Sequence, residues 1–189
     1  MLKKYKSQFI IALIIVAILF ISSIYIIFKF KDNNIEEVTL AVNCSPSNSV
    51  VVYNNLPISD ALGKKIEEND KNVRYVTLDI QNENDEAVKY QVYITKIDPS
   101  GNHIKDNYIK YYLTDENNSP VNGFEKNLIP TYNDFLYLRD KPSSKLLYEE
   151  TIEANTSKKL ILRVWVSDSY PISEQENDYA FKIGARGLK

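Results

Sequence analysis

The sequence predicts an all-β protein: an antiparallel β-sandwich of immunoglobulin-like or jelly-roll-like type, preceded by one N-terminal transmembrane helix. Three observations predict it. Residues 9–30 are apolar all round a helix, several later segments alternate apolar and polar residues, and polar turn clusters separate those segments. Period-two alternation is typical of strands with one buried face, and many short strands without a long helix indicate a sandwich.

The segment 9–30 is the predicted membrane anchor. As a helix that rises about 1.5 Å per residue it would be roughly 33 Å long, enough for a hydrocarbon core of about 30 Å. The apolar run is interrupted only by Ser22, Ser23, Tyr25 and Lys29. The side chains expected to face lipid include Phe9, Ile18, Phe20, Ile27 and Phe30.

Lysines near the anchor predict its orientation. Lys3, Lys4 and Lys6 precede the segment together with the N-terminal amine, whereas Lys29 and Lys31 follow it. The positive-inside rule therefore favours an N-terminus in the cytoplasm and a C-terminal domain outside. A cleaved signal peptide is the alternative, but its apolar region usually has about 7–15 residues and ends in a small-residue cleavage site.

Four parts are predicted: a short cytoplasmic tail at 1–8, the transmembrane helix at 9–30, a connector at 31–36, and an extracytoplasmic β-sandwich domain at 37–189. All 25 acidic residues follow Lys31, but only 18 of the 23 basic residues do, so this outer part carries a net charge of −7. Binding to nucleic-acid phosphates depends on clustered Lys and Arg. We therefore expect no nucleic-acid partner.

The outer domain contains alternating segments from end to end. The clearest are 74–80 and 89–97, and the polar cluster 82–86 between them predicts an antiparallel hairpin. Residues 58–68 fit either a single helical turn or a loop that crosses the sandwich. Further strands are predicted at 37–42, 50–53, 108–114, 135–139, 145–152, 160–167 and 179–185, with loops at 115–130 and 168–178.

The core motifs follow a recognisable order. They are Pro-Ile-Ser-Asp before Gly63, a strand that ends at Asn82, and then Tyr-x-Val-x-Ile at 90–94, Ile-Lys-Tyr-x-Leu at 109–113, Leu-Arg-Val-Trp-Val at 162–166 and Phe-Lys-Ile at 181–183. This order resembles the anchored or secreted β-sandwich surface proteins of low-GC Gram-positive bacteria, and distantly the TasA/camelysin group of biofilm matrix proteins. The resemblance covers about residues 37–187. It implies a β-sandwich at the cell surface and carries over no functional residue.

The candidate contact surface consists of residues on the strand faces opposite the aliphatic ones. In a sandwich those faces point outward, and exposed aromatic side chains form protein or carbohydrate contact surfaces. The alternative is that long loops cover them or that they pack as cross-strand pairs, with the arginine against a ring or an acidic neighbour. The residues are Tyr75, Tyr93, Tyr112, Trp165 and Arg163.

The sequence does not indicate catalysis or a cofactor. His103, the single histidine, is expected to be an exposed loop residue, and Cys44, the single cysteine, to be buried, with an intermolecular bridge as the alternative. One His and one Cys cannot complete a four-ligand zinc site. Oxygen-rich loops at 82–86, 115–118 and 168–178 leave calcium open, although their spacing matches no recognised ligand pattern.

These features predict a membrane-anchored binding or adhesion module, not an enzyme, that recognises a protein or a surface glycan. One alternative is a structural subunit of a surface fibre or biofilm matrix. Such a subunit would form homo-oligomers by passing a strand such as 37–42 to a neighbour's sheet edge. Another alternative is an accessory subunit of an envelope complex, whose transmembrane helix makes contacts through Ser22 and Ser23.

Overall fold

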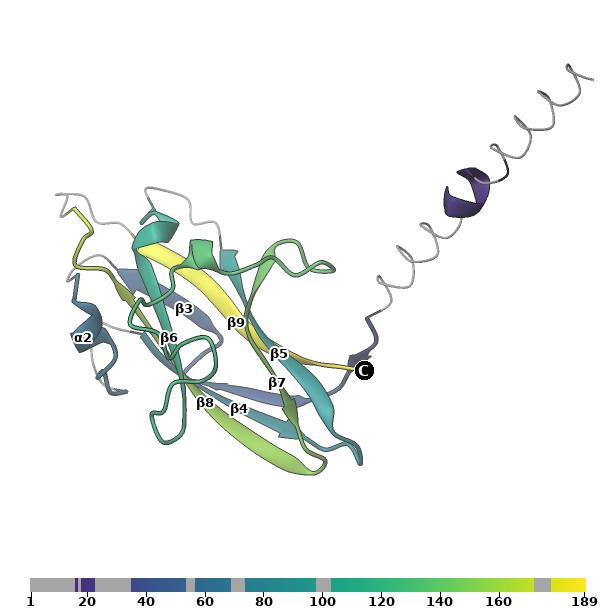
Figure 1. Ribbon diagram of the computed structural model, residues 1–189. Helices are drawn as coiled ribbons and strands as arrows, with labels where there is room; N and C mark the ends of the chain where they lie inside the picture. Colours follow the sequence, from purple (N-terminus) through teal and green to yellow (C-terminus); the bar gives the residue numbers. More distant parts are fainter. Residues whose placement is uncertain are drawn as a thin grey trace, which may run out of the picture. The chain divides into compact units, whose positions relative to one another are not determined.

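The computed structural model describes residues 16, 18–22, 35–53, 57–68, 74–97, 103–171 and 178–189. The chain separates into two units, Met1–Glu36 and Glu37–Lys189, and the second unit contains all the described strands (Figure 1).

The predicted anchor lies mostly outside the described residues. This holds for Phe9, Ile27 and Phe30, for the tail 1–8, and for most of the connector 31–36. Residues 16 and 18–22 are helical, and the side chains of Ile18 and Phe20 are exposed. Within the part of the chain that the structure describes, no helix has the length and apolar character needed to cross a bilayer.

The second unit consists of two antiparallel sheets. The four-stranded sheet has the order β2-β4-β8-β6, and the five-stranded sheet has the order β1-β9-β5-β7, with β3 also paired to β9. The strands are β1 Glu37–Val38, β2 Ala41–Ser45, β3 Ser49–Tyr53, β4 Arg74–Asn82, β5 Val88–Ile97, β6 Ile109–Asp115, β7 Ser144–Ile152, β8 Thr156–Val166 and β9 Asp178–Leu188. The short helices are α2 Asp60–Gly63, η1 Asp106–Tyr108 and η2 Tyr132–Asp134. The predicted all-β architecture of two antiparallel sheets is confirmed.

The core forms between the inner faces of the two sheets. On the four predicted strands 74–80, 89–97, 108–114 and 160–167, the side chains that alternation assigned to the buried face are almost fully inaccessible. Because successive side chains on a strand point to opposite faces, one apolar set per strand fills the space between the sheets. These inner residues include Val76, Leu78, Ile80, Tyr90, Val92, Ile94, Ile109, Tyr111, Leu113, Leu160, Leu162, Val164 and Val166.

The predicted hairpin between β4 and β5 is wrong. β4 pairs with β2 and β8, whereas β5 pairs with β7 and β9, so the turn after Asn82 carries the chain from one sheet to the other. Asn82 is fully buried, and its Nδ2 donates to the carbonyls of Glu86, Ile152 and Glu153 at 2.9–3.2 Å. These bonds fix the crossing, which alternation alone does not reveal because it reports the buried face and not the partner strand.

Two other predicted strands differ. The run 37–42 is divided between the sheets, because β1 pairs with β9 while β2 pairs with β4. Residues 135–139 form an irregular segment with one isolated bridge, Tyr137 to Lys145. There, the ring of Phe135 packs edge-on against Tyr111 of the core.

Candidate functional site

Three of the five predicted contact residues are buried. Tyr112, Arg163 and Trp165 retain 8 %, 4 % and 0 % of their accessible surface, whereas Tyr75 and Tyr93 are half-buried. The prediction of an exposed contact surface is therefore wrong for the three buried residues, and the alternative, cover by a loop, holds for them. Tyr93 lies in the five-stranded sheet, away from the other four, which the four-stranded sheet brings together.

Segment 57–68 covers the outer face of the four-stranded sheet at this end. Ile58 N donates to Val166 O at 3.0 Å, and Ile66 is 5 % exposed. The glycine at position 63 lies against the indole ring of Trp165, where any larger residue would overlap it. Both predictions for residues 58–68 are partly confirmed, because α2 is a single helical turn within a loop that crosses the sheet.

Arg163 fastens this cover to the sheet. Its Nε donates to Ile66 O at 2.8 Å and its Nη1 to Thr114 Oγ1 at 3.0 Å, while its Nη2 donates to Asn118 Oδ1. The guanidinium also lies 5.2 Å from the centre of the Tyr75 ring, which confirms the predicted pairing with an aromatic ring. Burial lowers the pKa of Arg163, but an arginine with five donors remains charged and serves here as a structural clamp.

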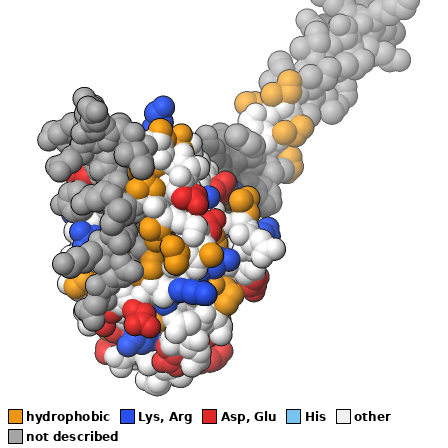
Figure 2. Space-filling view, turned by 90° about the vertical axis from the view of Figure 1, so that its left-hand side faces the viewer, with side chains coloured by type: hydrophobic (Ala, Val, Ile, Leu, Met, Phe, Trp, Pro, Cys, Tyr) orange, Lys and Arg blue, Asp and Glu red, His pale blue; other side chains and the backbone are white. Residues whose placement is uncertain are grey.

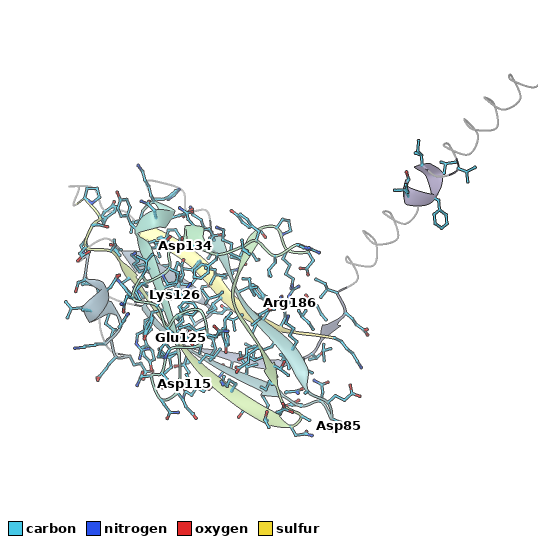
Figure 3. The ribbon with its side chains drawn as sticks, in the orientation of Figure 1. Asp85, Asp115, Glu125, Lys126, Asp134 and Arg186 are labelled. Carbon is cyan, nitrogen blue, oxygen red and sulfur yellow. The ribbon has the colours of Figure 1, made fainter. Side chains whose placement is uncertain are left out.

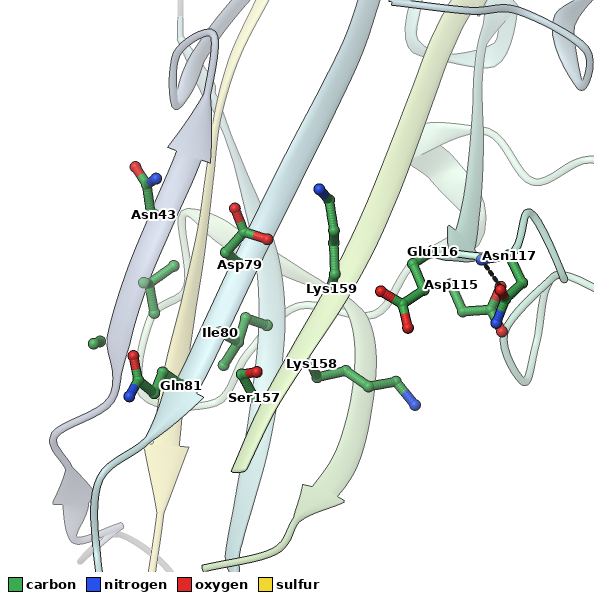
Figure 4. A pocket seen from close by; sticks show the side chains of 12 residues that line it. Asn43, Asp79, Ile80, Gln81, Asp115, Glu116, Asn117, Ser157, Lys158 and Lys159 are labelled. Carbon is green, nitrogen blue, oxygen red and sulfur yellow. Dashed lines mark hydrogen bonds between the residues drawn. The ribbon is translucent and has the colours of Figure 1, made fainter. Parts of the chain in front are cut away.

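The opposite end of the same outer face is open and forms a shallow polar groove of about 730 Å³. Figure 4 shows Asn43, Asp79 and Lys159 on three successive strands, β2, β4 and β8. The strand register places these three side chains in one row, and Ala41, Gln81 and Ser157 form the next row. One wall is the end of β6 with the turn that follows it: Asp115 is the last residue of the strand, and Glu116 and Asn117 belong to the turn.

The groove side chains are suited to hydrogen bonding more than to apolar contact. Asn43, Gln81 and Asn117 contribute amides, which donate and accept, and Ser157 contributes a hydroxyl. Asp79 and Lys159 are cross-strand neighbours of opposite charge. The lining of the groove includes no aromatic residue. The groove can therefore hold a polar ligand whose groups both donate and accept hydrogen bonds.

Asp115 belongs to the structure of the groove wall. Its Oδ1 accepts from the backbone N–H of Asn117 at 2.9 Å and of Ser119 at 2.8 Å, which closes the turn. Across the described part of the chain, no group of three or more His, Cys, Asp and Glu side chains is arranged to hold a metal ion.

Arg186, labelled in Figure 3, is the centre of an ion cluster on the outer face of the other sheet. Arg186 donates to Gln91 Oε1, to Glu37 Oε1 at 3.0 Å and to both oxygens of Asp140. Hydrogen bonding by Arg186 lowers the pKa of Asp140. The pKa of Glu37 is also lowered, mainly by its hydrogen bond with Lys141 and secondly by its hydrogen bond with Arg186. Because Glu37 belongs to β1, this cluster ties the start of the domain to the sheet.

Cys44 and His103 lie on different parts of the fold. Cys44 is half-buried on β2, where burial raises the pKa of its thiol. His103 is also half-buried, contrary to the expectation of an exposed loop residue, and forms a bridge with Asp178 at the start of β9. Cys44 thus lies in the four-stranded sheet, whereas His103 lies outside the named strands and bridges to β9 of the five-stranded sheet.

The face seen in Figure 2 has acidic and basic side chains interspersed with hydrophobic ones. The groove was not found from the sequence. One signal could have shown it: the outward-facing residues of β4 become more polar along the strand, from Tyr75 and Thr77 to Asp79 and Gln81. Such a change indicates where the segment that covers this face ends.

Comparison of the chain with family models, with curated proteins and with solved structures finds no match, so the resemblance to the TasA/camelysin group stays a prediction.

Proposed function

We propose that this chain is a membrane-anchored display module whose sandwich domain, of immunoglobulin-like or jelly-roll-like type, binds a surface glycan in the polar groove of the four-stranded sheet. The apolar segment 9–30 supports the anchoring, and the lysines before it support an extracytoplasmic domain. The module acts by binding and not by catalysis.

One observation carries the proposal: a single sheet face is covered at one end and left open and polar at the other. Segment 57–68 shields the aromatic half, whereas Asn43, Asp79 and Lys159 stay uncovered in the other half. Ligand sites are concave and combine a mostly apolar lining with a few convergent polar groups. This groove has the convergent polar groups, whereas its apolar lining is limited to Ala41, Val42 and Ile80.

The chemistry of the groove favours a glycan over an apolar peptide. Sugar hydroxyls donate and accept hydrogen bonds, as do the amides of Asn43, Gln81 and Asn117. An apolar anchor side chain of a protein partner would need a hydrophobic pocket, which the lining does not provide. The lining has three carboxylates, Asp79, Asp115 and Glu116, and two lysines, of which Lys158 pairs with Glu150 of β7 at 3.4 Å. A polyanion is therefore disfavoured.

The test is a glycan array probed with the full chain in detergent micelles. We expect binding to a set of neutral or weakly charged oligosaccharides. The double variant Asp79→Ala/Lys159→Ala should lose at least tenfold in affinity for them. The matched control Glu86→Ala/Lys182→Ala removes one charge of each sign outside the groove and should bind as the parent does. Equal loss in both variants, or no binding to any glycan, would refute the proposal.

A further inference from the structure

The strand β2 lies at an edge of the four-stranded sheet and differs from the other edge strands. An edge strand presents unpaired N–H and C=O groups, and most proteins protect such edges. The opposite edge, β6, is covered: Tyr111 N donates to Pro130 O at 3.0 Å, and Asp115 N donates to Ser119 O at 2.9 Å.

The five-stranded sheet also protects its edges. On β7, Leu146 N donates to Leu136 O at 2.8 Å, and on β3, Arg74 Nε donates to Val51 O at 2.6 Å. The remaining strand at that side, β1, has two residues only. For Ala41–Ser45, by contrast, no backbone hydrogen bond other than those to β4 is found within the described residues.

The composition of β2 also offers no protection. Its sequence, Ala-Val-Asn-Cys-Ser, contains no charge, no proline and no bulge. Lysines, inward-pointing charges and bulges are the usual devices that keep an edge from pairing. This neutral edge is notable in a domain with a net charge of −5, from 18 basic and 23 acidic residues at 37–189, because like-charged copies would otherwise repel each other.

From these observations we infer that β2 pairs antiparallel with β2 of a second copy of the chain, across a two-fold axis at Asn43. In this register Val42 faces the second copy's Cys44, and both are half-buried residues of the inner face. On the outer face Asn43 faces itself, and its amide can donate and accept across the axis. The two sheets become one sheet of eight strands, with both polar grooves on the same side.

The pairing is weak in dilute solution and strengthened at a membrane. A five-residue edge buries much less than the roughly 1,200–2,000 Å² of a standard stable interface. Confinement of both copies to one membrane raises their effective concentration, which favours pairing without any new contact. The inference concerns lateral pairing in which β1 and β2 remain in their own domain, and it does not depend on what the groove binds.

The test uses the full chain in lipid vesicles under mild oxidation. Val42→Cys places a thiol opposite the second copy's Cys44, at a cross-strand distance that a disulfide can span. We expect at least tenfold more disulfide-linked dimer than in the parent chain. Ala41→Cys, whose side chain lies on the other face, should show no such increase.

A second pair of variants tests the register. Asn43→Lys places two like charges opposite each other at the axis. In the Val42→Cys background it should therefore reduce the disulfide-linked dimer to the parent level. Ser45→Lys, also exposed at this edge, should reduce the amount of dimer as well. Thr151→Lys, an exposed position on β7, should leave it unchanged. Cross-linking that is equal at positions 41 and 42, that persists with Asn43→Lys, or that is absent throughout would overturn the inference.

Discussion

Gly63 lies directly against the indole ring of Trp165, so a methyl group at position 63 would overlap the ring. Gly63→Ala should lower the free energy of unfolding by about 1–3 kcal/mol, the usual cost of overpacking. Helix propensity alone predicts the opposite sign, a gain of up to about 1 kcal/mol. Urea unfolding followed by the fluorescence of the single tryptophan measures the change.

The control for this prediction is Leu62→Ala, because Leu62 is exposed in the same helical turn. It should change the free energy of unfolding by less than about 0.5 kcal/mol. A Gly63→Ala variant that is more stable than the parent would mean that the cover does not press on the indole.

Arg163 should prove essential to the cover. Arg163→Met keeps the length of the side chain but leaves Ile66 O and Thr114 Oγ1 without their donor. We expect a loss of about 2–4 kcal/mol in the free energy of unfolding, since buried acceptors lose their partners. Hydrogen exchange should also accelerate in segment 57–68. Lys182→Met, at an exposed position of β9, is the control and should not accelerate it.

Asn82 should tolerate no carboxylate. Asn82→Asp points an acceptor at the carbonyls of Glu86, Ile152 and Glu153, and we expect a loss of about 3–5 kcal/mol in the free energy of unfolding, as for an uncompensated buried charge. Asn133→Asp, on the surface, should be nearly neutral. Thermal unfolding compares the two, and equal effects would contradict the role of Asn82 as the tie between the sheets.

Acid should weaken the Arg186 cluster. The pKa of Asp140 lies below its ordinary value of 3.8 in the folded state, because Arg186 donates to it. A lowered folded-state pKa means that the stabilisation is complete above the ordinary pKa and is lost as the pH falls through the folded-state value. Asp140→Asn should cost about 1.5 kcal/mol at pH 7 and flatten the decline in stability as the pH falls below the ordinary carboxyl pKa of 3.8.

Urea midpoints of the parent and Asp140→Asn across this pH range measure the effect. Asp85→Asn, in the exposed turn before β5, is the control and should keep the parent's decline. A parallel decline in the parent and Asp140→Asn would show that the cluster contributes nothing to acid sensitivity.

Alternation predicted most of the fold, because it depends only on which side of a strand meets the core. Val76, Leu78 and Ile80 are buried as their spacing indicates. It could not predict sheet membership, since the turn after Asn82 has the same polar composition whether it closes a hairpin or crosses between sheets. That choice depends on long-range bonds from Asn82 to Ile152 and Glu153.

The candidate site was predicted less well for a related reason. The outer aromatic faces were correctly located on the strands, but the sequence did not show that segment 57–68 would cover Tyr112, Arg163 and Trp165. The polar groove was missed because its residues come from β2, β4, β8, the end of β6 and the turn after it, and only the strand register places them together.

The most direct test of the central proposal is lysine acetylation of the full chain in detergent micelles, with and without hydrolysed cell-wall polysaccharide of a Gram-positive bacterium. Lys159 lies in the groove and Lys182 lies on the other sheet, so one molecule contains both probe and control. The account predicts that the polysaccharide slows acetylation of Lys159 several-fold and leaves Lys182 unchanged. Slowing at Lys182 alone, equal slowing at both, or no effect at Lys159 would contradict it.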